Sequence, residues 1–110
     1  MARDDYFVIA AKILDYLYKC LKKGIAPEPE LLSPEALGIN ESYWNYIFQN
    51  LSEYGYITGV ISKKLIGNPE VQVKLQYNKL RITPPGIEYL AENSTMKKAL
   101  ETLQTIKDLI

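Results

Sequence analysis

The segment that decides the fold runs from Ser33 to Ile57 and reads SPEALGINESYWNYIFQNLSEYGYI. The segment contains two signals for the start of a helix, because Ser33 stands before a proline and Asn40 before a glutamate. Gly38 closes the first of these helices after one or two turns. The segment therefore predicts two consecutive helices joined by a tight turn, which is the arrangement that a helix-turn-helix needs.

The second of these helices, over residues 41–54, is amphipathic. Apolar side chains recur at spacings of three and four residues and define a buried face made of Trp44, Ile47, Phe48, Leu51 and Tyr54. We expect the other side chains to face outward, as the base-reading surface of a recognition helix, namely Ser42, Tyr43, Asn45, Tyr46, Gln49 and Asn50. Amide side chains pair with adenine and a tyrosine can reach a phosphate. The alternative is an ordinary solvated helix face.

The flanking sequence completes an α+β pattern. An amphipathic helix over residues 4–23 precedes the segment, with extended connector 25–32 between them. After it, β-branched residues and then an alternating stretch predict a hairpin over 57–83, with Lys63, Lys64 and residues 67–69 in its break. A short helix follows Thr83, and a last helix spans 95–110, capped by Ser94 or Thr95. The order predicts one winged helix-turn-helix domain over residues 1–110, with three helices, a hairpin wing and two C-terminal helices.

Charge is distributed unevenly along a chain that is neutral overall, with 13 cationic and 13 acidic residues. The wing has five cations against one carboxylate, a net charge of +4, and the cations are Lys63, Lys64, Lys74, Lys79 and Arg81. A basic wing suits contact with DNA phosphates, although lysines on a hairpin also keep it soluble and block edge pairing. No Lys or Arg lies between Lys23 and Lys63, which weakens the case for a helix that enters DNA.

The last helix carries a seam of apolar residues, made of Met96, Ala99, Leu100, Leu103, Ile106 and Ile110. Their spacing is that of a short coiled coil of about two heptads. A surface this apolar is not left in water, so it packs either on this domain or on a second copy. Of the two, we favour a homodimer through the C-terminal helix, since a dimer doubles the contact with a palindromic site.

Several classes of function are excluded or disfavoured by composition. In its 110 residues the chain has no His and one Cys, Cys20, which leaves no His-dependent triad, no His-ligated metal and no internal disulfide. We find no catalytic residues and expect no enzyme activity, no cofactor and no metal. The apolar runs are too short for a membrane span, so we expect a cytoplasmic protein. Of the nine tyrosines, most fall at core or boundary positions, with Tyr46 as the exception.

The two ends of the chain together resemble a known family. Residues 55–60 (GYITGV), the passage from Ile82 to Asn93 and the terminal TIKDLI of residues 105–110 are similar to the YjcQ-like family, small winged-helix proteins of Gram-positive bacteria and their phages. The resemblance implies the fold and brings no established activity. Our first hypothesis is a protein that binds double-stranded DNA, as a transcriptional regulator of phage or prophage origin. The alternative is a protein–protein interaction module without DNA affinity, whose acidic third helix engages a basic partner.

Overall fold

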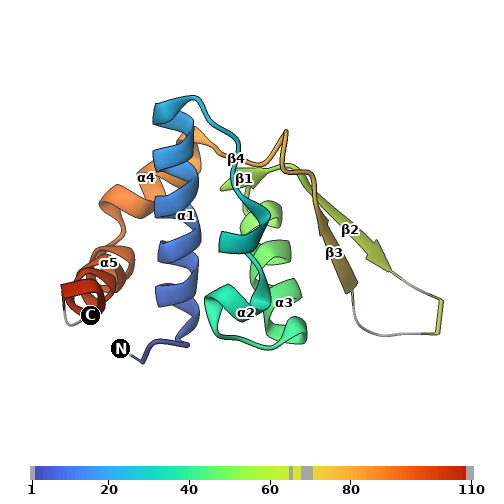
Figure 1. Ribbon diagram of the computed structural model, residues 1–110, viewed down its shortest axis with the longest axis horizontal. Helices are drawn as coiled ribbons and strands as arrows, with labels where there is room; N and C mark the ends of the chain where they lie inside the picture. Colours follow the sequence, from blue (N-terminus) through green and yellow to red (C-terminus); the bar gives the residue numbers. More distant parts are fainter. Residues whose placement is uncertain (1, 65, 68–70, 109–110) are drawn as a thin grey trace.

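The computed structural model describes residues 2–64, 66–67 and 71–108, and its elements follow the predicted order (Figure 1). Within these ranges the architecture is α+β, with five α-helices and two small antiparallel sheets, and it is compatible with a winged helix. The elements are α1 (Tyr6–Lys23), a 3-10 turn η1 (Pro29–Leu31), α2 (Pro34–Leu37), α3 (Glu41–Glu53), β1 (Ile57–Thr58), β2 (Val60–Lys64), β3 (Val71–Leu75), β4 (Arg81–Ile82), α4 (Pro84–Glu92) and α5 (Ser94–Asp108).

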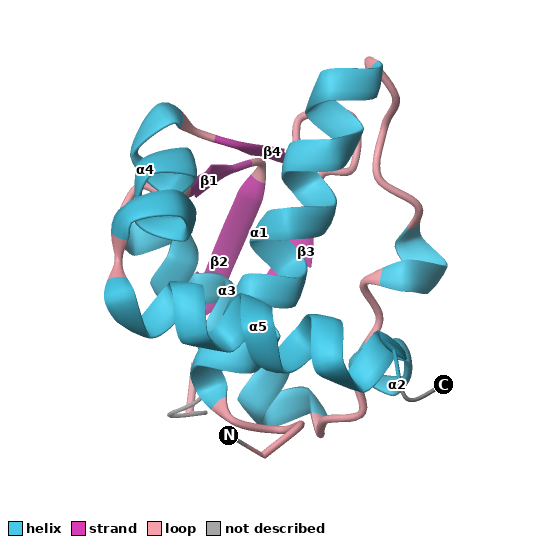
Figure 2. Ribbon diagram, turned by 90° about the vertical axis from the view of Figure 1, so that its left-hand side faces the viewer, coloured by secondary structure: helices cyan, strands magenta, loops and turns pink. Residues whose placement is uncertain are grey.

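Helix α1 forms the centre of the molecule. It contacts α4 and α5 on one side and α3 on the other, as Figures 1 and 2 show from two directions. For this reason α1 is buried on more than one face, with Val8 and Leu14 buried as well as Ile9 and Ile13. The alanines of α1 are fully buried, and their small side chains let neighbouring helices approach closely. The core is therefore built around α1.

Local capping chemistry places the helix starts as the sequence predicts, with one correction. The side chains of Ser33, Asn40 and Thr83 each accept a hydrogen bond from a backbone N–H in the first turn of α2, α3 and α4. The start of α5 differs, because Asn93 Oδ1 accepts from the N–H groups of Thr95 and Met96. An asparagine caps a helix as well as a serine does. Asn93 is the single residue between the end of α4 and the start of α5.

The wing consists of a short base and a longer arm. The base pairs β1 with β4, and the arm pairs β2 with β3, both antiparallel. One expectation is corrected here, because Lys63 and Lys64 lie in strand β2 and not in the loop. Residues 81–82 pair with β1 and are not part of the arm. Gly59 makes the bend between base and arm, where its φ is +85° and an added Cβ would lie 2.6 Å from Leu80 Cα.

The apolar seam of α5 packs within the chain over the part that the structure describes. Met96 and Ala99 are fully buried, and Leu103 is nearly so, because α5 lies against α1 and α4. Leu100 is half-buried against the same core. The side chains of Ile106 and Ile110 lie outside the described residues. Met96, Ala99 and Leu103 therefore stabilise this domain, and a homodimer through α5, which stays a prediction, would have to use other surface.

Candidate functional site

Helix α3 buries four of the five residues of its predicted apolar face, all but Tyr54. Ile47, Phe48 and Leu51 are buried completely or nearly so, and Trp44 is 8% exposed. The indole N–H of Trp44 donates to the carbonyl of Leu32 at 2.7 Å, which satisfies both polar groups in a buried place. Trp44 is therefore a core residue that fixes α3 against the connector before α2.

Asn45 is corrected from a base-reading residue to a structural one. Its side chain is only 8% exposed, and its Oδ1 accepts a hydrogen bond of 3.2 Å from the backbone N–H of Val73 in β3. The helix face that carries Asn45 is covered because the wing arm packs against α3. Asn45 therefore holds the wing to the helix and cannot meet a base edge.

The other predicted residues of α3 fall into two groups. Ser42, Tyr46 and Gln49 lie on the solvent side, and the Gln49 amide donates to the Glu53 carboxylate at 3.1 Å. Tyr43 and Asn50 lie nearer α1: the Tyr43 hydroxyl donates to the carbonyl of Asp4 at 2.8 Å, and Asn50 Nδ2 donates to the carbonyl of Tyr46 at 2.7 Å. The outward strip of α3 is thus narrow.

The cations of the wing are exposed, but they do not share one face. Strand register places Lys63 opposite Gln72 and Lys74 opposite Ile61, and all four side chains point to the same side of the arm. Lys64, opposite Val71, points to the other side. Lys79 and Arg81 are exposed at the base. None of the five forms an ion pair with another described residue.

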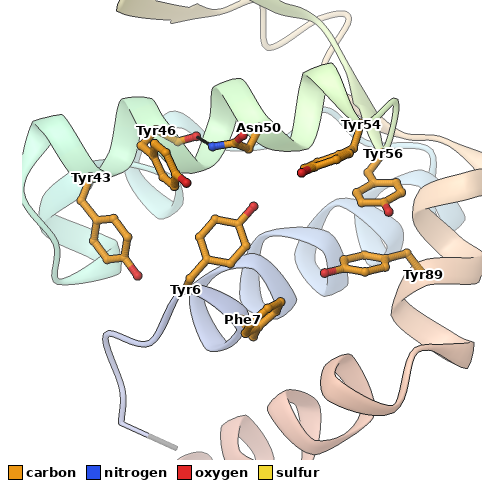
Figure 3. A pocket seen from close by; sticks show the side chains of 8 residues that line it. All are labelled: Tyr6, Phe7, Tyr43, Tyr46, Asn50, Tyr54, Tyr56 and Tyr89. Atoms are coloured by element: carbon orange, nitrogen blue, oxygen red, sulfur yellow. Dashed lines mark hydrogen bonds between the residues drawn. The ribbon is translucent and has the colours of Figure 1, made fainter. Parts of the chain in front are cut away.

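A second feature, which the sequence reasoning missed, is an open cavity of about 450 Å³ between α1, α3 and α4 (Figure 3). Its wall is almost entirely aromatic and consists of Tyr6, Phe7, Tyr43, Tyr46, Asn50, Tyr54, Tyr56 and Tyr89. Tyr54 is the clearest correction, because it is 66% exposed beside this cavity instead of lying in the core. The spacing 43, 46, 50, 54 was a usable signal, since those positions form one stripe along a helix.

The aromatic rings of the cavity pack in a definite order. Tyr56 and Tyr89 are stacked, with ring centroids 4.3 Å apart and an interplanar angle of 10°, and Tyr54 stacks on Tyr56 at 5.8 Å. Tyr6 and Tyr46 meet edge to face, with centroids 6.1 Å apart and an angle of 72°. The stack closes one end of the cavity, and the nearly perpendicular pair forms a corner at the other (Figure 3).

The phenol groups of Tyr6 and Tyr89, which line this cavity, have raised pKa values. Burial, with smaller contributions from the phenols of Tyr89, Tyr46, Tyr54 and Tyr43, raises the pKa of Tyr6 to about 12. Burial also raises the pKa of Tyr89, with Tyr56 and Tyr54 adding to it. At neutral pH Tyr6 and Tyr89 therefore offer hydroxyl groups and ring faces to the cavity.

Two further findings limit the chemistry of the described residues. No three side chains of the metal-binding types come together in that part of the chain. Nor does any of its helices combine the length and apolar character needed to cross a membrane. Cys20 is a free, buried thiol on α1.

Comparison with known proteins gives one match. A family model described as YjcQ protein matches residues 11–109, which is nearly the whole chain. No curated protein and no solved structure matches.

Proposed function

The chain belongs to the YjcQ family, and on this premise we propose that it is a winged-helix protein that binds double-stranded DNA as a transcriptional regulator. In this proposal the wing makes the leading contact with the phosphates. Helix α3 lies alongside the groove and offers Ser42, Tyr46 and Gln49 to the duplex.

The observation that carries the proposal is the segregation of charge. Residues 57–83 have a net charge of +4, so the remainder of this neutral chain has a net charge of −4. The wing arm lies outside α3 at one end of the molecule, which places its cations at the periphery and far from α4 and α5 (Figure 1). Lys63 and Lys74 share one exposed face of that arm. Such a surface attracts a polyanion even when the protein as a whole is neutral.

The composition of α3 explains why, in this proposal, the wing and not the helix supplies most of the contact with the phosphates. The solvent side of the helix carries the carboxylates of Glu41 and Glu53 and no Lys or Arg. Because phosphate neutralisation supplies most of the affinity for DNA, this helix adds little to it. The polar side chains of α3 add hydrogen bonds only after the wing has brought the duplex close.

The test is fluorescence anisotropy with a labelled random-sequence duplex, titrated from low to physiological salt. We compare the wild type with Lys63→Gln/Lys74→Gln, and with Lys97→Gln/Lys98→Gln as a control that removes the same charge. Both control lysines are exposed on α5, at the opposite end of the molecule from the arm (Figure 1).

The wing variant should weaken binding and lower the steepness of log K against log salt by about 1.8, at roughly 0.9 for each lost phosphate contact. The control should leave that slope within error of the wild type. Equal effects of the two variants would show that only overall charge matters and would refute a wing-led interface.

One observation favours the second candidate, a protein–protein interaction module. The 39-residue stretch from Gly24 to Ser62 has no cation, and it includes all of α3. A helix with this charge suits a basic protein partner better than DNA. This candidate predicts no salt-dependent binding to the duplex, even at low salt, with wild type and both variants alike.

A further inference from the structure

We propose that the aromatic cavity between α1, α3 and α4 is a binding site for a small organic cation with an alkylammonium or quaternary ammonium head. No wing cation lines the site, and Tyr46 is the one residue that it shares with the side chains of α3 offered to the duplex. Its volume of about 450 Å³ lies within the roughly 300–1,000 Å³ that small-molecule sites occupy.

The ring geometry suits a cation. The face of an aromatic ring is electron-rich and attracts a cation placed over it, and several rings around one guest form an aromatic cage. Tyr6 and Tyr46 stand at 72° to each other, so both can present a face to one guest in the corner between them. Their side chains come from different helices, and both hydroxyl ends lie at the cavity (Figure 3).

The charges around the cavity also favour a cation over an anion. The elements that form its wall carry no Lys or Arg in residues 6–11, 41–56 and 84–92. Tyr43, on its rim, lies close enough to Asp4 and Asp5 for these carboxylates to raise its pKa, after the larger effect of burial. An anion would find neither a cationic partner in this wall nor a favourable field.

The hydroxyl groups argue against a purely apolar guest. The phenol oxygens of Tyr6, Tyr46 and Tyr54 have no hydrogen-bond partner among the described residues, and they point into the cavity (Figure 3). An apolar guest would cover these oxygens and leave them without water. A cationic head instead gains from the lone pairs that the hydroxyl oxygens direct at it.

The experiment titrates the full-length protein, without DNA, and follows the tyrosine ring signals by two-dimensional NMR. The probes are choline and 3,3-dimethylbutan-1-ol, which has the same shape but no charge. We expect choline to give saturable shifts at Tyr6, Tyr46 and Tyr89, and the neutral alcohol to give none at the same concentrations. Equal shifts from both probes, or none from choline up to tens of millimolar, would overturn the proposal.

Variants of single tyrosines distinguish the loss of a ring from the cavity from a general loss of the folded structure. Tyr46 is 58% exposed, so Tyr46→Leu removes a ring of the corner without opening the core. We expect it to weaken choline binding about 3- to 10-fold, the range of a partly desolvated cation–π contact, whereas Tyr46→Phe keeps the ring and most of the affinity. The control Tyr18→Leu removes a tyrosine of α1 outside the cavity, one that already packs against Lys22 at 4.4 Å. A loss with the control as large as with Tyr46→Leu would refute the assignment.

Discussion

Replacing Asn45 by alanine tests whether this residue holds the wing to α3. The change removes the acceptor of the Val73 N–H, a bond of 3.2 Å whose side-chain partner is only 8% exposed. A donor left without an acceptor costs about 1–3 kcal/mol, and the lower half of that range applies because Val73 is half-buried and open to some water. Alanine returns roughly 0.5 kcal/mol through its higher helix propensity. The net loss is therefore about 1 kcal/mol, which lowers the melting temperature of a chain of this length by roughly 4 °C.

Two measurements decide this prediction. Thermal denaturation compares Asn45→Ala with Gln49→Ala, a control on the same helix whose amide bonds only to the exposed Glu53 carboxylate. The control should change the free energy of unfolding by less than about 0.5 kcal/mol. Hydrogen exchange should show lower protection of the Val73 amide in Asn45→Ala alone. Unchanged stability and unchanged Val73 exchange, together with altered discrimination between DNA sequences, would restore Asn45 as a base-reading residue and refute the structural role.

Three more outcomes follow from single contacts. The free energy of unfolding should fall as pH rises from 10 to 12, because the native state keeps Tyr6 protonated, with a pKa of about 12, while the unfolded chain ionises it near 10. Tyr6→Phe should lose the part of this pH dependence that comes from Tyr6. Urea titrations at about pH 9 and about pH 11 measure the difference. Trp44→Phe should cost about 1–3 kcal/mol in chemical denaturation, since the Leu32 carbonyl loses its buried donor. Gly59→Ala should lower the melting temperature more than Gly55→Ala, because both have positive φ but only Gly59 has backbone within 2.6 Å of an added Cβ; equal losses would contradict the close approach.

The sequence alone predicts those structural features, such as helix caps and buried helix faces, that depend on residues close together in the chain. Asn40 and Thr83 are caps because their side chains reach N–H groups three residues away, and Trp44 is buried because its helix repeats every 3.6 residues. The 3.6-residue repeat identifies one buried face of a helix, and it cannot predict that another element covers a second face of the same helix. Asn45 is buried by Val73, which lies 28 residues further along and reaches it only after the wing has folded back.

The cavity was missed for the same physical reason. Its corner joins Tyr6 of α1 to Tyr46 of α3, and its stack joins Tyr56 to Tyr89 of α4. None of these pairs is close in the sequence, and each tyrosine alone reads as a boundary residue with an apolar ring and a wet hydroxyl. Only the packing of α3 and α4 against α1 brings the rings together. The stripe of positions 43, 46, 50 and 54 was visible in the sequence, but the sequence does not show which residues of other helices face it.

The way in which α3 is shared constrains any account of function. One side of the helix packs in the core through Ile47 and Phe48, a second holds the wing through Asn45, and a third borders the cavity through Tyr46. What remains for a duplex is a narrow strip in which the Gln49 amide is already bonded to the Glu53 carboxylate. A DNA base would have to displace that bond beside a negative charge, which costs more than one neutral hydrogen bond returns. Under the proposed function, specific reading by α3 alone would therefore be weak, and affinity for DNA would depend on the cations of the wing that Asn45 keeps in place.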